Sequence, residues 1–245
     1  MKKQLLIITL FFAFFCANCS QPKSNFPDLT KVAIDEPGNV FFAYDKETTR
    51  FINTSCSMLA ADDPFFCNED EMFEEQLVVA KFKNKLLNDS VVITYSSGPS
   101  ADPVFVVSTA EGKAIKSFYC LEFYLNSSAT IYTSGHTNNM YDRRRKYQLQ
   151  SDTIVEIGQQ YNYVGLEGRS LKEITLYNEM EGTEIIAQLP VGSEIEILLA
   201  DGSLADFDID ITYLVKTDFG LVGWLRLSGQ DAYGEIMEEL FYAGD

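Results

Sequence analysis

Short runs of apolar residues recur along most of the chain and are separated by turn-forming residues. Many of the runs are rich in Val, Ile, Thr, Phe and Tyr, which favour strands, and they end at clusters of Gly, Pro, Asn, Asp or Ser. Gly98-Pro99 and Asn126-Ser127-Ser128 are two such clusters. The pattern predicts strands over Val40–Tyr44, Gln76–Phe82, Ser90–Tyr95, Val104–Ser108, Ile115–Leu125, Thr130–Thr133, Lys146–Leu149 and Ile154–Ile157.

The close spacing of these runs predicts a mostly β protein, with an antiparallel β-sandwich or meander over residues 39–168. A helical turn or two is expected at Asn68–Leu77, because Asn68 can cap it and acidic residues follow at the positive end of the helix dipole. We identify no resemblance to a known family in this region.

The chain begins with a different pattern. Lys2 and Lys3 precede the apolar run Leu5–Ala17, which is too short for a bilayer core of about 20 residues. It fits the hydrophobic region of a secretory signal instead. The polar, proline-containing residues 19–38 then predict a tether between a membrane and the folded domain.

Ala17-Asn18-Cys19-Ser20 resembles the cleavage site of a bacterial lipoprotein. The resemblance implies that residues 1–18 are a signal peptide and that Cys19 becomes the first residue, acylated with palmitate. It also implies a lipid anchor in the cell envelope, and Ser20 is the residue type that favours sorting to the outer membrane. The residues before Cys19 depart from the usual small and aliphatic types, and an ordinary cleaved signal is the alternative.

The C-terminal third carries an ordered set of strands and turns. Ile174–Tyr177 is followed by Glu184–Ile197, which contains a Pro-Val-Gly turn, and then by Tyr213–Leu225, which contains a hairpin turn and Gly-Trp. Beyond them, Ile236 and Leu240 recur at helical spacing, which predicts a short terminal helix over residues 233–245.

This order of turns resembles the bacterial SH3-like (SH3b) domain and implies an SH3-like barrel over residues 169–232. In such a barrel we expect the indole of Trp224 to be buried against Leu189, Ile195 and Leu214. An exposed Trp224 would instead be a platform for a ligand. Tyr213 stands where the family usually has a tryptophan, so Tyr213 and Trp224 are both candidate ligand-binding residues.

The charge of the chain is strongly acidic. It has 36 Asp and Glu against 19 Lys and Arg, a formal net charge of −17. Binding to nucleic acid is excluded as a main function, because phosphates need compensating cations. The acidic residues concentrate toward the C-terminus, where only Lys216 and Arg226 are basic after Glu173.

One polar segment, Ser134–Tyr147, holds the only strong basic cluster. Arginine forks can bind a carboxylate or phosphate, and tyrosines can stack on a sugar. Alternatively, the arginines pair with the acidic C-terminal domain. The candidate ligand-binding residues of this segment are His136, Asn138, Tyr141, Arg143 and Arg145.

Other reactive residues give weaker signals. Cys56 and Cys67 flank a short loop and are a candidate disulfide pair in an oxidising compartment, although the odd count of three cysteines after Cys19 argues against a disulfide. Cys120 lies in a strand-like run, where a buried thiol is ordinary packing, and its pairing with His136 as nucleophile and base is the less favoured interpretation. Asp206–Asp210 could offer oxygen ligands to calcium, but it lacks the EF-hand order, and a solvated acidic loop is favoured.

These patterns predict a non-catalytic, lipid-anchored envelope protein without cofactor or metal. It would bind a cell-wall (peptidoglycan) peptide or an envelope protein through its SH3-like domain. The alternative is an acidic inhibitor or sequestering protein for a basic envelope enzyme, since complementary charge speeds association.

Overall fold

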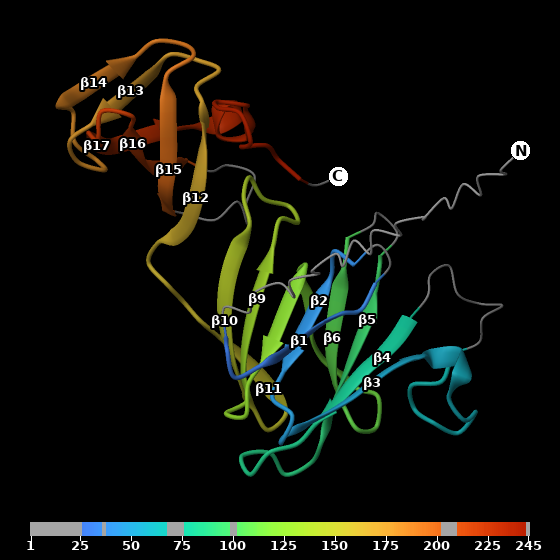
Figure 1. Ribbon diagram of the computed structural model, residues 1–245. Helices are drawn as coiled ribbons and strands as arrows, with labels where there is room; N and C mark the ends of the chain where they lie inside the picture. Colours follow the sequence, from blue (N-terminus) through green and yellow to red (C-terminus); the bar gives the residue numbers. More distant parts are fainter. Residues whose placement is uncertain (1–25, 36–37, 68–75, 99–101, 202–209, 244–245) are drawn as a thin grey trace, which may run out of the picture.

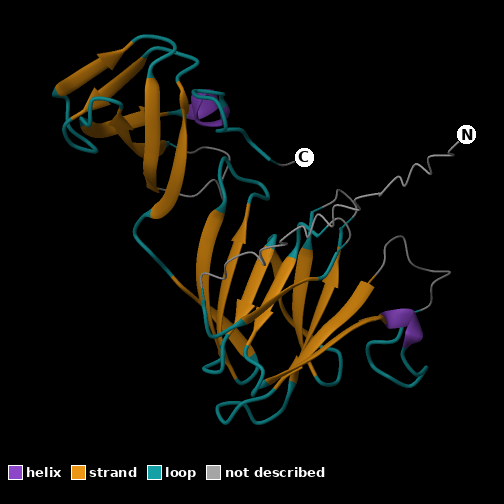
Figure 2. Ribbon diagram, in the orientation of Figure 1, coloured by secondary structure: helices purple, strands orange, loops and turns teal. Residues whose placement is uncertain are grey.

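The computed structural model describes residues 26–35, 38–67, 76–98, 102–201 and 210–243, without the side chains of Gln230 and Tyr233. Strands dominate this part of the chain (Figure 2), which confirms the mostly β prediction. The only helices within it are two short 3-10 helices, η1 (Cys56–Met58) and η3 (Gly229–Tyr233). None of the described helices has the length and apolar character needed to cross a membrane.

The strands from β1 to β11 form two sheets that face each other (Figure 1). The first sheet has the order β1 (Thr30–Ala33), β2 (Phe41–Tyr44), β8 (Glu122–Leu125), β9 (Thr130–Gly135), β10 (Arg143–Gln150) and β11 (Thr153–Ile157). The second has the order β3 (Thr49–Ser55), β4 (Gln76–Phe82), β5 (Val91–Ser96), β6 (Val104–Thr109) and β7 (Ala114–Tyr119).

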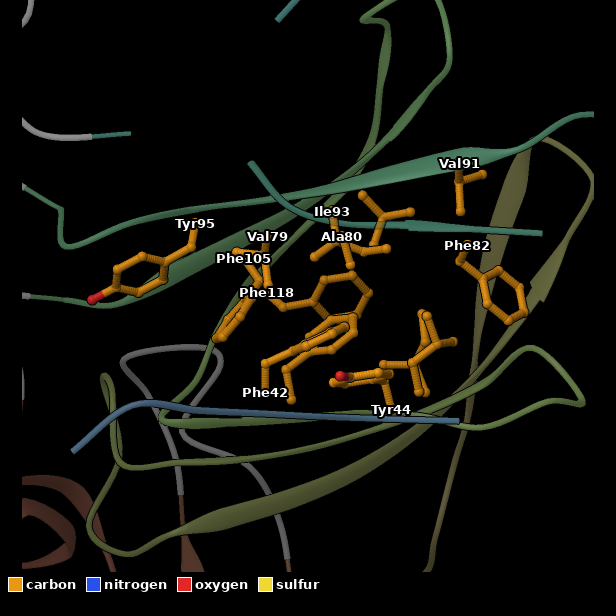
Figure 3. Packing of buried hydrophobic residues seen from close by; sticks show 14 of the residues in the cluster. Phe42, Tyr44, Val79, Ala80, Phe82, Val91, Ile93, Tyr95, Phe105 and Phe118 are labelled. Carbon is orange, nitrogen blue, oxygen red and sulfur yellow. The ribbon is translucent and has the colours of Figure 1, made fainter. Parts of the chain in front are cut away.

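Aromatic rings join the two sheets in a common core (Figure 3). Phe105 of the second sheet packs on both Phe42 and Phe123 of the first, with ring centroids 6.4 and 5.0 Å away. All three side chains are fully buried. Burial of apolar area is the main stabilising contribution in such a core.

The run Ile115–Leu125, expected as one strand, is two strands in different sheets. β7 ends at Tyr119, the chain crosses at Cys120 and Leu121, and β8 begins at Glu122. β8 then pairs with β2 in parallel, so the first sheet is mixed and not purely antiparallel. The sequence does not reveal this crossing, because no glycine, proline or other turn-forming cluster interrupts the run Ile115–Leu125.

Two strands of these two sheets were not predicted, β1 and β3. β1 lies in the expected tether (residues 19–38) but pairs with β2, and Phe26 packs on Tyr132 with centroids 4.7 Å apart. Lys31 of β1 also forms an ion pair with Glu122. Residues 26–35 are therefore part of the fold, and the leader with Cys19 lies outside the described residues.

The third sheet has the order β12 (Asn162–Arg169), β15 (Glu194–Asp201), β16 (Ile211–Thr217), β17 (Val222–Leu227), β13 (Ile174–Tyr177) and β14 (Ile185–Leu189). β12 was not predicted as a strand, and most of its residues were expected in the first domain (residues 39–168), but it pairs with β15. The predicted turns are present at Gly192 and Gly220, whose φ angles of 86° and 92° favour glycine.

The third sheet differs from the predicted barrel in two ways. Its edges, β12 and β14, are not joined by any pairing between described residues, so the barrel is not closed. The terminal helix is not formed in residues 234–243, where turns and single bridges replace it. The reason is that backbone groups there bind other segments: Leu171 N–H donates to the Ile236 carbonyl and Glu238 N–H to that of Arg169.

Trp224 also differs from the prediction. It is only half-buried, because its neighbours Gly223 and Leu225 occupy the inward face of β17. Gly223 is required for a close approach of β13, since a Cβ there would come within 3.0 Å of the Tyr177 carbonyl oxygen.

The candidate pair Cys56 and Cys67 forms a disulfide, with Cα atoms 5.3 Å apart. The helix expected at Asn68–Leu77 lies mostly outside the described residues, and its last two residues, Gln76 and Leu77, begin β4.

Candidate anion-binding cavity

A cavity of about 430 Å³ opens at one end of the two facing sheets. Strands β7, β9 and β10, the loop between β9 and β10, and the C-terminal segment all contribute to it. Its lining consists of Lys116, Ser117, Phe118, Tyr119, Thr133, Gly135, Thr137, Asn138, Asn139, Arg143, Arg145, Tyr147 and Tyr242.

The alternation of β10 directs two arginines into this cavity. Successive side chains of a strand point to opposite faces. Tyr147 and Leu149 are buried in the core, so Arg143 and Arg145 lie on the same inward face, beyond the end of the core. On β7, Lys116 likewise shares its face with the buried Phe118.

Two aromatic rings lie where the core meets the cavity. Phe118 and Tyr147 come from opposite sheets and meet edge to face, with centroids 5.0 Å apart. The Lys116 ammonium lies 5.4 Å from the centroid of Tyr147 and 6.0 Å from that of Phe118. The ring faces attract this cation, which holds it at the cavity wall.

The described residues that line the cavity carry positive charges and include no carboxylate. Burial lowers the pKa of Arg143, and the like charge of Arg145 lowers it further. Arg143 Nε is buried without a hydrogen-bond partner in the described chain. The carboxylate of the exposed Glu156, which pairs in register with Tyr147, acts in the opposite direction and raises the pKa of Arg143.

A glycine makes room for this arrangement. Gly135 pairs directly with Arg143 across β9 and β10. A Cβ at Gly135 would lie 2.7 Å from the Cα of Cys120, so a larger residue cannot fit without moving the backbone. The close packing of β9 on Cys120 therefore fixes one wall of the cavity.

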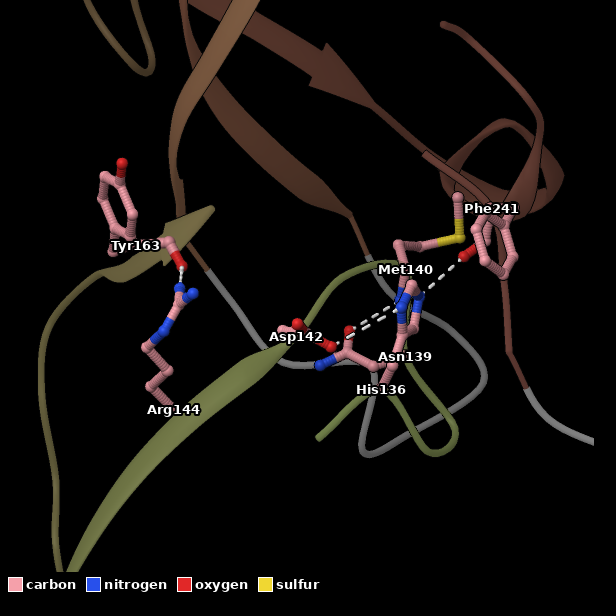
Figure 4. A network of polar contacts seen from close by, with 7 residues as sticks. All are labelled: His136, Asn139, Met140, Asp142, Arg144, Tyr163 and Phe241. Carbon is pink, nitrogen blue, oxygen red and sulfur yellow. Dashed lines mark hydrogen bonds and ion pairs between the residues drawn. The ribbon is translucent and has the colours of Figure 1, made fainter. Parts of the chain in front are cut away.

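The C-terminal segment holds the loop that borders the cavity (Figure 4). The ring nitrogen Nε2 of His136 lies 3.0 Å from the carbonyl oxygen of Phe241. The Tyr242 hydroxyl donates to Asn138 Oδ1 at 3.3 Å, and the Ala243 N–H donates to the Asn139 carbonyl at 3.0 Å. These contacts join residues that are distant in the sequence.

The predicted ligand-binding residues separate into three groups. Asn138, Arg143 and Arg145 line the cavity, and His136 positions its loop. Tyr141 and Tyr213 are buried in the core of the third sheet, with centroids 6.5 Å apart, and do not reach the cavity. Trp224 lies on the outward face of that sheet.

The alternative interpretation was that the arginines of the basic segment form ion pairs with the acidic C-terminal region. The segment does contact that region, but through contacts other than ion pairs. Met140 and Tyr141 insert into the core of the third sheet. Arg144, on the outward face of β10, donates to the Tyr163 carbonyl at 3.3 Å (Figure 4). Within the described residues no ion pair joins Arg143 or Arg145 to the acidic C-terminal region.

Sequence reasoning missed Lys116 and Tyr242 as lining residues. The alternation of Lys116 with Phe118 on β7 was a usable signal, because both must point to the same face. No local signal identifies Tyr242, since its position depends on a contact with Asn138 far away in the sequence.

The other candidate chemistry finds little support in the described chain. Burial raises the pKa of the Cys120 thiol, and the charge of Glu122 adds to this, whereas a nucleophilic cysteine needs a lowered pKa. His136 contacts Phe241 and Asp142. No metal-binding group of three ligands occurs among the described residues, and Asp206–Asp208 lie outside them.

Comparisons of the chain with protein-family models, curated proteins and solved structures found no match.

Proposed function

We propose that this protein is a non-catalytic binding protein of the cell envelope that captures an anionic ligand in the cavity between β7, β9 and β10. The observation that carries the proposal is the inward convergence of Lys116, Arg143 and Arg145, with no carboxylate among the described residues of the lining.

The energetics of this cluster support a binding role. Placing like charges together and partly out of water disfavours folding unless a partner compensates them. A carboxylate or phosphate group supplies that compensation, and guanidinium groups bind both with charge-assisted hydrogen bonds. The cavity volume of about 430 Å³ is in the usual range for small-molecule sites.

The lining also provides neutral groups that can orient a ligand. Thr133, Thr137 and Asn138 offer hydroxyl and amide groups. Charge and hydrogen-bond donors are sufficient for binding, so we propose binding and not turnover. A cell-wall peptide, which carries free carboxylates, is one ligand with the required chemistry.

The envelope location is part of the same proposal. It rests on the leader pattern of Lys2, Lys3 and Leu5–Ala17 and on the lipidation of Cys19. We also propose that β12–β17 are an SH3-like domain, supported by the order of the turns at Gly192 and Gly220. In this protein its buried core receives Met140 and Tyr141 from the loop that borders the cavity.

Calorimetric titration with citrate and with inorganic phosphate tests the cavity. We expect saturable binding of one or both anions that weakens as salt rises, since salt screens charge. Arg145→Gln should weaken binding about tenfold, equivalent to about 1.4 kcal/mol.

Lys146→Gln is the matched control, because Lys146 is the next residue on β10 but lies 5.9 Å from the centroid of Tyr132, on the outward face. It should leave the affinity unchanged. The proposal would be contradicted if neither anion binds, or if Arg145→Gln and Lys146→Gln lower the affinity equally.

A further inference from the structure

The outward face of the third sheet carries a row of large apolar side chains that crosses five strands. Each member is the direct cross-strand partner of the next. Directly paired residues of antiparallel strands lie on the same face. In order from β12 to β13, the row consists of Tyr163, Leu199, Leu214, Trp224 and Tyr177.

The row is only one residue wide. On one side, the neighbouring row across β15, β16 and β17 is Asp201, Thr212 and Arg226. On the other side, the next row across β12, β15, β16 and β17 is Glu167, Glu196, Lys216 and Val222. The apolar side chains therefore form a strip between two largely polar rows.

The strip is separate from the core of the sheet. None of its five members belongs to the buried cluster inside the third sheet. Tyr163 is 54% exposed, and the other four are half-buried. Two side chains beside the strip pack against its rings. The ring centroids of Tyr161 and Trp224 are 6.0 Å apart, and the Arg226 guanidinium lies 3.8 Å from the ring centroid of Tyr177.

The dimensions of the strip argue against a folded protein partner. A stable protein interface buries about 800 Å² on each side, in a patch many residues wide. A second copy of this chain is disfavoured further, because two molecules with a net charge of −17 repel each other. A narrow strip fits a linear polymer instead.

The side chains of the strip favour a sugar polymer over a peptide. Tyr and Trp rings present a negative face that attracts the C–H bonds of a pyranose ring, and their O–H and N–H groups can bond to hydroxyls. Arg226 adds donors beside Tyr177. Adjacent strands are about 4.8 Å apart, so a row across five strands extends over roughly 19 Å.

We infer that this strip binds a linear chain of neutral sugars. The site is distinct from the cavity, since it uses only residues of the third sheet. The proposed anionic ligand and the sugar chain are therefore expected to bind independently.

Trp224 is the only tryptophan of the protein, so its fluorescence reports on the middle of the strip. The test is to titrate the full chain with cellohexaose and with the hexamer of N-acetylglucosamine, and to measure the emission of Trp224 together with the heat of binding. We expect a saturable change with at least one oligomer, and a weaker response to its disaccharide because that spans less of the strip.

Tyr163→Ala should weaken this binding about tenfold, equivalent to about 1.4 kcal/mol. Its matched control is Phe219→Ala, which removes another exposed ring, 89% accessible, from the turn between β16 and β17 outside the strip. Phe219→Ala should have no effect, and neither should Arg145→Gln, which tests the cavity alone. Circular dichroism of each variant establishes that it is folded.

The inference is overturned if neither hexamer binds, or if Tyr163→Ala and Phe219→Ala weaken binding equally. It is also overturned if a neutral Thr–Ala repeat peptide changes the emission of Trp224 and the sugars do not.

Discussion

His136 and Phe241 are 105 residues apart in the sequence, yet their rings stack with centroids 4.9 Å apart and His136 Nε2 lies 3.0 Å from the Phe241 carbonyl oxygen. Together with the bridge between Asn139 and Ala243, this contact attaches the C-terminal segment to the loop after β9. The position of the loop, and with it one wall of the cavity, depends on residues at the opposite end of the chain.

Replacing His136 should loosen this attachment. In His136→Ala the hydrogen bond and the ring contact are both lost, for which we expect a decrease of about 1–2 kcal/mol in the free energy of unfolding. Hydrogen exchange measured by mass spectrometry should accelerate at the Ala243 N–H, which donates to Asn139. Phe219→Ala is a suitable control, and unchanged exchange in His136→Ala would contradict the contact.

The two buried tyrosines of the third sheet should respond in opposite ways to loss of their hydroxyls. The Tyr213 hydroxyl has no hydrogen-bond partner in the described chain, whereas that of Tyr141 bonds to the Asn162 side chain. Tyr213→Phe should therefore leave the stability unchanged or raise it by about 1 kcal/mol, and Tyr141→Phe should lower it by about 1 kcal/mol. Urea unfolding of both variants measures the difference, and a large loss in Tyr213→Phe would show that the hydroxyl is satisfied.

The same tyrosines predict a loss of stability in alkali. Burial raises the pKa of Tyr213 and raises that of Tyr141 to about 12. Phenols of the unfolded chain, with pKa values of about 10, therefore release their protons first as the pH rises. Below that pH the protonated tyrosines contribute fully to the free energy of unfolding. Above it the free energy of unfolding should fall. Tyr213→Phe should make this fall shallower, and an identical pH profile would contradict the assignment.

A fragment of residues 170–245 should not fold on its own. It lacks β12, whose pairing with β15 forms one edge of the third sheet. A fragment of residues 158–245 should fold, but with lower stability than in the whole protein, because the buried Met140 and Tyr141 are missing and large buried side chains contribute about 3–5 kcal/mol each. Thermal melting followed by circular dichroism tests both fragments. A cooperative transition in residues 170–245 would show that β12 is dispensable.

Lipidation predicts the behaviour of the N-terminus. Cys19→Ala should move the protein from the membrane fraction to a soluble or unprocessed form, because Leu5–Ala17 is too short to span a bilayer. Membrane fractionation and mass spectrometry of the mature N-terminus provide the measurement. A mature protein without an acyl mass at Cys19 would contradict the lipoprotein assignment.

The sequence by itself determined the class of the fold and many of its strands. Gln76–Phe82 was predicted with its observed bounds, and the turns at Gly192 and Gly220 were located, because alternation, β-branched residues and glycine act over a few neighbouring positions. The short loop between Cys56 and Cys67 made them the candidate disulfide pair, but only the structure shows that they are bonded. The sequence also identified Arg143, Arg145 and Asn138 as candidate ligand-binding residues, because a basic cluster is conspicuous in an acidic chain.

Only the tertiary structure decided how these elements combine. The crossing at Cys120 between two sheets, the place of β12 in the third sheet and the docking of residues 234–243 all depend on pairing between distant segments. The cavity exists because Lys116 on one sheet faces Arg143 and Arg145 on another, and Tyr242 joins them from the C-terminus. Such convergence depends on the packing of whole sheets, so no local pattern of residue types encodes it.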